Sequence, residues 1–319
     1  MTMIVAGGAG FVGSNLIGRL LQSGERVVAI DNLSRGSLQW IEQFLSQKNF
    51  TFLEADLASP DFFEPADASI GGEPISDVWH LAANSDIPAG VRDPQVDLKA
   101  TFLTTFHLLN YMRVVGAKRM LFASSSAIYG DFGEEEISEK SAPTLPISNY
   151  GAMKLASEAQ ISAAAESHLE QVQLFRFPNV VGFPATHGVI FDFIRKLKTD
   201  PSQLHVLGDG TQQKSYMHVS DLVDAMLHAA GHFKQRRVVL NIGPVDDGVT
   251  VRWIAEQVVA RVAPRARMEF GQGNRGWVGD VPRFRYSVAQ LSQSGWRPKR
   301  GSEEAILEAI DEIARQEGF

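Results

Sequence analysis

Short apolar runs alternate with longer helical segments through the first two-thirds of the chain. The runs cover residues 3–6, 27–30, 50–53, 78–81, 120–123 and 172–177, and they are almost continuously apolar. Parallel strands that are buried on both faces show this pattern. Two segments predict long helices, residues 95–115 and 150–170. The alternation therefore predicts an α/β fold with a Rossmann-type, doubly wound parallel sheet.

After about residue 178 the pattern becomes less regular. Glycine and proline turns occur at residues 182–184 and 208–210, and short helices are expected near 222–230, 253–262 and 303–315. We therefore predict a Rossmann domain over residues 1–175 and a smaller, irregular α/β lobe over residues 176–319. A further strand is expected at residues 238–242, and the sequence leaves open whether it returns to the main sheet.

Composition narrows the range of partners. The net charge of −7 argues against a nucleic-acid or anionic-membrane surface, because such surfaces are usually basic. The chain contains no cysteine, and His187, His205 and His218 show no metal-ligand spacing, so we expect no disulfide and no metal. No basic leader precedes the first strand, and no apolar run reaches the roughly 18–20 residues that span a bilayer. We therefore expect a cytoplasmic protein.

The first strand leads into a glycine-rich turn, Gly7-Gly8-Ala9-Gly10-Phe11-Val12-Gly13, and a helical pattern follows. Such glycines let the backbone approach a pyrophosphate at the positive end of the helix. Asp31 closes the second strand 18 residues after Gly13, where a carboxylate accepts hydrogen bonds from the adenosine ribose and repels a 2′-phosphate. Asp56, after the third strand, is placed to meet the adenine amino group. The sequence therefore predicts NAD rather than NADP as the cofactor.

A candidate catalytic group follows the fifth strand. This strand ends in Ser124-Ser125-Ser126, and Tyr150 and Lys154 lie four residues apart at the start of the next helix. Residues at this spacing share a helix face. Because an ammonium group stabilises a phenolate, we expect Lys154 to lower the pKa of Tyr150 towards neutrality and make it a general base. Lys154 can also hold the nicotinamide ribose, and a serine hydroxyl can bond to the sugar oxygen that is oxidised.

These motifs resemble those of the extended short-chain dehydrogenase/reductases, in particular the NAD-dependent nucleotide-sugar epimerase/dehydratase family (UDP-glucose 4-epimerase-like). The resemblance rests on blocks in the family's order, at residues 7–13, 31, 56–57, 80–83, 124–130, 150–154, 176–182, 208–221 and 279–282. It implies a Rossmann domain with a small nucleotide-sugar lobe, and a homodimer packed through the helices near 95–115 and 150–170. It also selects Ser125 as the catalytic serine, because the family's serine or threonine lies four residues before the tyrosine of a Tyr-Gly pair, here Tyr129.

The resemblance also implies which residues contact each ligand. For NAD it adds to the fingerprint Asn32, Leu57, Leu81, Ala82, Ala83, Ser124, Tyr150, Lys154 and Phe177. For the nucleotide sugar it implies Ser85, Ser126, Asn179, Lys214, Tyr216 and Asp280. Four positions depart from the family: Lys214 and Trp277 stand in place of arginines, although Arg275 is near, Thr101 replaces an asparagine, and Pro178 stands where an aromatic residue is often found. These departures affect the expected specificity for the nucleotide base and for the sugar more than the expected class of reaction.

The residues after the catalytic serine separate the reactions of the family. Dehydrating members resemble one another in an Asp-Glu pair there and decarboxylating members carry a glutamate, whereas this chain has Ser126-Ala127. Without an acid to protonate a leaving hydroxyl, oxidation and re-reduction at one carbon is favoured.

We therefore expect a nucleotide-sugar 4-epimerase, in which Tyr150 takes the proton of the 4-hydroxyl while a hydride passes from C4 to NAD. The resulting 4-keto sugar turns and receives the hydride on its other face. A nucleotide-sugar ketoreductase and, less favoured, a non-catalytic NAD-binding protein are the alternatives.

Overall fold

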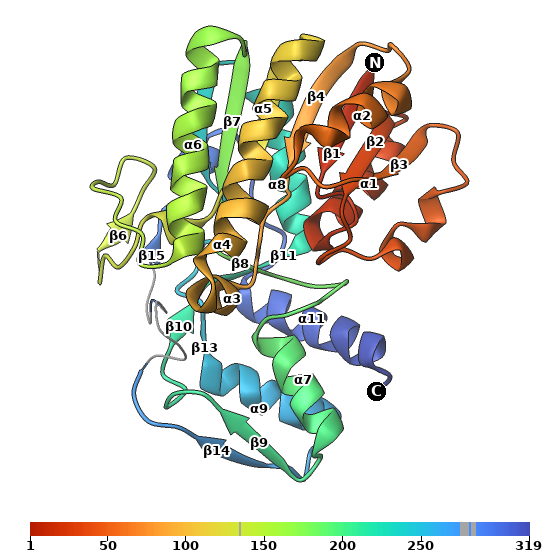
Figure 1. The fold of residues 1–319 in the computed structure, drawn as a ribbon. Helices are drawn as coiled ribbons and strands as arrows, with labels where there is room; N and C mark the ends of the chain where they lie inside the picture. Colours follow the sequence, from red (N-terminus) through yellow and green to blue (C-terminus); the bar gives the residue numbers. More distant parts are fainter. Residues whose placement is uncertain (134, 275–280, 282–284) are drawn as a thin grey trace. The chain divides into compact units, whose positions relative to one another are not determined.

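The computed structural model describes residues 1–133, 135–274, 281 and 285–319 (Figure 1). The chain divides into two compact units. The first consists of Met1–Ile128, Pro146–Arg176 and Leu227–Leu240, and the second of Tyr129–Leu145, Phe177–Met226 and Asn241–Phe319. Each unit therefore combines segments that are far apart in the sequence.

A seven-stranded sheet forms the centre of the first unit, in the order β12-β7-β5-β4-β1-β2-β3. Its strands are β1 (Thr2–Ala6), β2 (Arg26–Asp31), β3 (Phe50–Glu54), β4 (Ile75–His80), β5 (Arg119–Ala123), β7 (Gln171–Arg176) and β12 (Arg237–Asn241). The pairings from β3 across to β7 are parallel, so the predicted doubly wound parallel sheet is confirmed. Because the chain order diverges on the two sides of β1, the carboxyl ends of β1 and β4 form the switch point where such sheets bind ligands.

Three helices cover one face of this sheet: α2 (Phe63–Ile70), α5 (Thr104–Val115) and α6 (Asn149–Ser167) (Figure 1). Their buried side chains pack with those of the strands in one apolar cluster that includes Ile4, Leu108 and Ile161. The unit also contains α1 (Phe11–Gln22), α3 (Ile87–Arg92), α4 (Pro94–Asp97), a π-helix (Leu98–Leu103) and 3-10 turns at Leu38–Trp40, Glu42–Phe44, Pro60–Phe62 and Ser126–Ile128.

The helix predicted over residues 95–115 is not uniform. It consists of α4, the π-helix and α5 in direct succession. The hydroxyl groups of Thr104 and Thr105 both donate to the carbonyl oxygen of Thr101, at 3.0 and 3.1 Å. Such side-chain bonds compete with the regular helical ladder. The π-helix lies in the part of this helix that packs against α6.

Three helices form the core of the second unit: α7 (Val189–Thr199), α9 (Val251–Val262) and α11 (Ser302–Glu317). Buried side chains such as Ile194, Val258 and Ile310 pack between them. Short strand pairs accompany this core: β8 (Asn179–Val181) with β11 (Tyr216–His218), β9 (Gln203–Val206) with β14 (Arg267–Phe270), β10 (Gln213–Lys214) with β13 (Val249–Thr250), and β6 (Glu136–Ile137) with β15 (Arg285–Tyr286). The unit also holds α10 (Ala289–Gln293), and α8 (Val219–His232) begins here and ends in the first unit. In the described part of the chain, no helix has the length and apolar character needed to traverse a lipid bilayer.

Candidate functional site

The glycine-rich turn connects β1 to α1. Gly7 has a φ of +82°, and a Cβ atom there would lie 2.6 Å from the backbone nitrogen of Ala82. A Cβ atom on Gly13 would lie 2.1 Å from the carbonyl oxygen of Gly7, so both positions require glycine. Gly10 precedes α1 and has no side chain to bond the free N–H groups of the first helical turn. The turn therefore forms a cradle for an anion at the positive end of the helix.

Asp31 holds its carboxylate at the end of β2, beside this turn. Oδ2 accepts the N–H of Ala9 at 3.0 Å, and Oδ1 accepts the N–H of Leu33 at 2.8 Å. Burial raises the pKa of Asp31, and these two backbone hydrogen bonds oppose the rise. The carboxylate is therefore oriented by the backbone of the glycine turn itself.

The next two predicted cofactor residues contact each other. The amide of Asn32 donates to Oδ1 of Asp56 at 3.3 Å, and the same oxygen accepts the N–H of Ala58 at 3.0 Å. Leu57 lies between Asp56 and Ala58 in the chain, and its side chain is buried in the apolar cluster between the sheet and its helices. One carboxylate oxygen of Asp56 is thus engaged within the protein.

The other cofactor candidates of the first unit lie at the ends of β1, β4 and β5. Phe11 and Val12 open α1, and the segment after β4 contains Leu81, Ala82 and Ala83, followed by the exposed Ser85, a candidate for the nucleotide sugar. The turn at Gly7 touches Ala82, so two of these segments meet at the switch point. The site fits NAD: it offers a cradle that a Cβ atom would fill, free N–H groups at a helix start, and a carboxylate at the end of β2.

Ser125, Tyr150 and Lys154 come together where β5 ends and α6 begins. Tyr150 is hydrogen-bonded to Ser125, whose hydroxyl oxygen also accepts the N–H of Ala127 at 3.1 Å. Lys154 lies one helical turn further on, with Nζ 5.9 Å from the centre of the Tyr150 ring. A Cβ atom on Gly151 would lie 2.4 Å from the carbonyl oxygen of Ala127. Glycine after Tyr150 therefore lets α6 start directly against the turn that carries Ser125.

The surroundings of Tyr150 contradict the pKa expected for its hydroxyl group. Burial raises the pKa of Tyr150 to about 12, while the hydrogen bond with Ser125 opposes this rise and the charge of Asp97 adds to it. Lys154 donates from Nζ to the carbonyl oxygen of Ala123 at 2.6 Å, and burial lowers its own pKa to about 7. The prediction that Lys154 brings the pKa of Tyr150 towards neutrality is therefore wrong for the protein alone, because desolvation is the largest influence on this phenol and raises its pKa.

Sequence patterns did not identify a buried ionic network beside Lys154. Ser124 donates from Oγ to Oε1 of Glu158 at 2.5 Å. Arg176 donates to the same carboxylate from Nε at 2.9 Å and from Nη2 at 2.6 Å. All three side chains are buried. The one signal in the sequence is the position of Glu158, four residues after Lys154 on the helix that carries Tyr150.

A second buried acid, Asp97, was also missed. Its Oδ1 accepts a hydrogen bond from the amide of Asn84 at 2.8 Å, and burial raises its pKa. A Cβ atom on Gly90 would lie 1.7 Å from Oδ2 of Asp97, so the carboxyl group fills the space above this glycine. An acid at the start of a helix is usually exposed, so the sequence gives no signal that Asp97 is buried and acts on Tyr150.

The candidates for the nucleotide sugar are divided between the units. Asn179 of β8 and Tyr216 of β11 are direct partners in the strand pair, and the N–H of Tyr216 donates to Oγ of Ser302 at 3.0 Å. Lys214 lies on β10, opposite Val249 of β13. Phe177 belongs to this second unit, whereas Ser85 and Ser126 belong to the first. Asp280, Trp277 and Arg275 lie outside the described residues.

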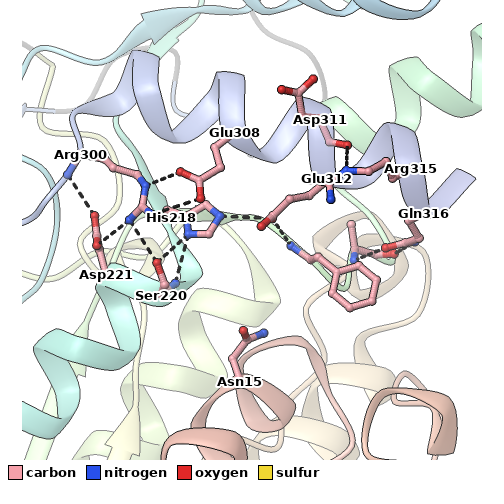
Figure 2. A network of polar contacts seen from close by, with 12 residues as sticks. Asn15, His218, Ser220, Asp221, Arg300, Glu308, Asp311, Glu312, Arg315 and Gln316 are labelled. Carbon is pink, nitrogen blue, oxygen red and sulfur yellow. Dashed lines mark hydrogen bonds and ion pairs between the residues drawn. The ribbon is translucent and has the colours of Figure 1, made fainter. Parts of the chain in front are cut away.

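A polar network joins His218 to α11 in the second unit (Figure 2). Nε2 of His218 lies 3.2 Å from Oε2 of Glu312, which accepts the N–H of Phe183 at 2.9 Å. Nδ1 of His218 lies 2.8 Å from the hydroxyl of Ser220. The network continues through ion pairs among Glu308, Arg300 and Asp221. Because these groups already bond to one another, we interpret the network as a structural clasp that joins α11 to the end of β11 and to the residues after β8.

Comparison with known proteins places this arrangement in context. Residues 3–243 match the model of the NAD dependent epimerase/dehydratase family. A crystal structure of UDP-galactose 4-epimerase is 33% identical, with a TM-score of 0.85 over 99% of both chains. UDP-glucose 4-epimerase of Thermus thermophilus, solved in complex with NAD, is 31% identical, with a TM-score of 0.84 over 98% of this chain and 99% of that one. UDP-glucuronic acid decarboxylase 1 of Xenopus tropicalis is 30% identical over 70% of this chain and 52% of its own length. The similar proteins therefore include both 4-epimerases and a decarboxylase.

Proposed function

This chain belongs to the NAD-dependent epimerase/dehydratase family, and on that basis we propose that it is a 4-epimerase of a nucleoside-diphosphate sugar. Its cofactor is NAD. In the proposed reaction the sugar is oxidised at C4 to a ketone, turns within the site, and is reduced at the same carbon on the other face.

The observation that carries the proposal is the group formed by Ser125, Tyr150 and Lys154 beside a turn without acids. The two positions after Ser125 are Ser126 and Ala127, where dehydrating and decarboxylating members of the family carry carboxyl groups. Elimination of a hydroxyl needs an acid that protonates the leaving oxygen. Its absence from this turn supports epimerisation over the reactions of those members.

Each catalytic side chain has a role that follows from its position. Tyr150 removes the proton of the 4-hydroxyl and later returns it, and Ser125 holds the same sugar oxygen through its hydroxyl. NAD supplies an oxidised ring that takes up a hydride and gives it back. The pKa of Tyr150 is about 12 in the protein alone, so its hydroxyl group needs a positive charge nearby before it can act as a base. Lys154 supplies that charge when it is protonated.

We assign most of the NAD contacts to the first unit and the nucleoside diphosphate of the substrate to the second. Asn179 and Tyr216 lie side by side in the pairing of β8 with β11, which supports a common role in holding the ligand. Lys214 offers a positive charge for a diphosphate. An ammonium group lacks the two-pronged geometry of a guanidinium, so we expect Lys214 to bind phosphate less tightly than the arginine of its relatives.

Product analysis with a panel of nucleotide sugars tests the proposal. The purified protein is incubated with UDP-, GDP-, CDP- and dTDP-hexoses, and the configuration at C4 is determined by NMR. We expect inversion at C4 with no net change in the absorbance of reduced cofactor, since each turnover returns the hydride that it removes. Steady consumption of NADH would instead establish a ketoreductase, and release of carbon dioxide from a nucleotide-linked uronic acid would establish a decarboxylase. Either outcome overturns the proposal.

Replacement of Tyr150 tests the assignment of the base. We expect Tyr150→Phe to lower kcat by a factor of about 100 or more, because general acid–base catalysis contributes at least that much, while NAD still binds. Tyr111→Phe is the matched control: it removes a hydroxyl that donates to Asp67 at 2.7 Å, outside the catalytic group. A Tyr150→Phe variant as active as this control would contradict the assignment.

A further inference from the structure

The carboxylate of Glu158 occupies a position that the reaction outlined above does not explain. It lies one turn beyond Lys154 on the same face of α6 and is 3% exposed. Lys154 donates to the carbonyl oxygen of Ala123 at 2.6 Å, and Ser124, the next residue, donates to Glu158 at 2.5 Å. Two successive residues at the end of β5 therefore bind two successive charged groups of α6.

Stability alone does not account for this arrangement. Removing two charges from water costs about as much as their attraction returns, and apolar side chains of similar size often serve as well. Arg176 binds Glu158 through two hydrogen bonds, which keeps the carboxylate ionised and fixed in direction. Such an ionised acid in a low-dielectric interior acts strongly on any charge nearby.

We propose that Glu158 is a positioning residue of the catalytic group, which keeps Lys154 protonated and holds Ser124 in place, and that Arg176 keeps Glu158 ionised. The inference rests on the proposed function for the use that it gives to Lys154. It goes beyond that function in assigning the charge state of the catalytic lysine to a residue that touches neither cofactor nor sugar.

The other groups around Lys154 cannot take over this task. Burial lowers the pKa of Lys154 to about 7, and the charge of Glu158 is what opposes that fall. From β4, His80 stays neutral because burial and the charge of Lys154 lower its pKa to about 3. From β5, the ring of Phe122 lies 4.7 Å from Nζ, and on α6 the neighbour is the uncharged phenol of Tyr150. Asp97 of α4 acts on Tyr150, and burial raises its pKa. Without Glu158, the amine would be neutral where the reaction needs its charge.

Titration of Lys154 by NMR tests the proposal directly. The protein is labelled with 13C at the ε-carbon of lysine, and the signal of Lys154 is identified by its absence from Lys154→Arg. We expect Glu158→Gln to lower the pKa of Lys154 by about one pH unit or more, as the loss of a buried neighbouring charge requires. Arg176→Lys should leave it close to the wild-type value, because the lysine keeps a positive charge beside Glu158 and the carboxylate stays ionised.

The two variants are matched, because both disturb the two-pronged contact between Arg176 and Glu158, but only Glu158→Gln removes the negative charge. A purely structural role would move the pKa of Lys154 in the same direction in both. An unchanged value in Glu158→Gln, or an equal fall in both variants, would overturn the proposal. If either single variant fails to fold, the double variant Glu158→Gln/Arg176→Gln leaves no unpaired charge. There the pKa of Lys154 should still lie below that of the wild type, since the charge of Glu158 is what raises it, and a wild-type value would overturn the proposal.

A pH profile separates this inference from the proposed function. In Glu158→Gln we expect the alkaline limb of kcat to move to lower pH, in step with the NMR titration. If no epimerase activity is found while Lys154 titrates as expected, the proposed function fails and the role of Glu158 stands. If the enzyme is an epimerase but its alkaline limb does not move in Glu158→Gln, the role of Glu158 fails alone.

Discussion

At the scale of single residues, the carboxylate of Asp31 sets the expected preference for NAD over NADP. Two backbone N–H groups orient it beside the glycine turn, at 3.0 and 2.8 Å. We expect Asp31→Asn to raise the Kd for NAD about tenfold or more, because a hydrogen bond to a charged group is worth about 1.5–3 kcal/mol. The preference for NAD over NADP should also narrow, since the charge that repels a 2′-phosphate is lost.

Calorimetric titration with both nucleotides measures these changes. Glu42→Gln is the control, because it makes the same change of charge on an exposed 3-10 turn. We expect this control to bind both nucleotides like the wild type. Equal affinities for NAD in Asp31→Asn and in the wild type would show that the ribose is bound elsewhere.

Whether a functional residue can be predicted from the sequence depends on what makes it functional. Backbone geometry requires glycine at positions 7 and 13, and the fixed spacing of glycines in the sequence indicates that requirement. The pair formed by Glu158 and Arg176 depends on a contact between α6 and the end of β7, which no local pattern encodes. The pKa of Tyr150 was expected in the wrong direction for a related reason, since burial is a property of the folded chain.

At the scale of single elements, the start of α6 positions the catalytic tyrosine. A Cβ atom on Gly151 would lie 2.4 Å from the carbonyl oxygen of Ala127, and neither backbone can withdraw easily. We expect Gly151→Ala to destabilise the protein by about 1–3 kcal/mol through overpacking. It should also lower kcat more than it weakens NAD binding, because Tyr150 moves with the helix. Chemical denaturation and steady-state kinetics measure the two effects.

Gly231 offers a matched control on a different helix. It is exposed on α8, and a Cβ atom there would have no atom within 4 Å. Gly231→Ala should therefore leave activity unchanged and be neutral or slightly stabilising, since alanine favours helix more than glycine does. If Gly151→Ala behaved in the same way, the close packing of α6 on the 3-10 turn would not matter for Tyr150.

The clasp that joins α11 to β11 and to the residues after β8 makes a prediction about pH in the second unit (Figure 2). Burial favours the neutral form of Glu312, but the hydrogen bond and charge of His218 and the N–H of Phe183 outweigh it, so the pKa of Glu312 is lowered from 4.5. A lowered pKa means that the carboxylate adds stability above pH 4.5 and loses it as the pH falls through the folded-state value. We expect Glu312→Gln to cost about 1–2 kcal/mol at neutral pH, and less as the pH drops below 4.5.

Chemical denaturation at several pH values checks this expectation. The control is Glu269→Gln, since Glu269 also lies 3.3 Å from a histidine, His205, but both side chains are more than half exposed. Solvent screens such a pair, so its loss should change the free energy of unfolding very little. A cost for Glu312→Gln that equals the cost for Glu269→Gln would contradict the clasp.

Regular elements were predictable because burial on both faces leaves a continuous apolar run in each strand. All six runs in the first part of the chain correspond to strands of the sheet, from β1 to β7. The π-helix at Leu98–Leu103 was not predictable, because it differs from an α-helix in which carbonyl oxygen each backbone N–H group bonds. The periodicity of apolar residues indicates which face of an element is buried, but it does not indicate which backbone groups form its hydrogen bonds.

At the scale of the whole molecule, the outer surface of α5 and α6 makes a prediction about assembly. These helices lie side by side on the sheet (Figure 1), and α5 exposes Phe106 and Val114, which are 39% and 68% exposed. On α6 the exposed positions include the small residues Ala159 and Ala163. Large side chains on one helix beside small ones on the other can interdigitate with a second copy of the same surface. We therefore propose a homodimer with this surface as its interface.

Replacement of Phe106 tests this assembly. A buried charge at the centre of an apolar interface is costly, so we expect Phe106→Asp to raise the Kd of the dimer about 100-fold or more. Sedimentation equilibrium over a range of concentrations measures that constant. The control Leu38→Asp places the same charge on an exposed leucine of the first unit, 41% exposed, on a 3-10 turn away from both helices. It should dimerise like the wild type, because association depends on the surface of α5 and α6 and not on exposed apolar side chains in general. A wild-type protein that stays monomeric at micromolar concentration, or equal weakening by both variants, would rule out this interface.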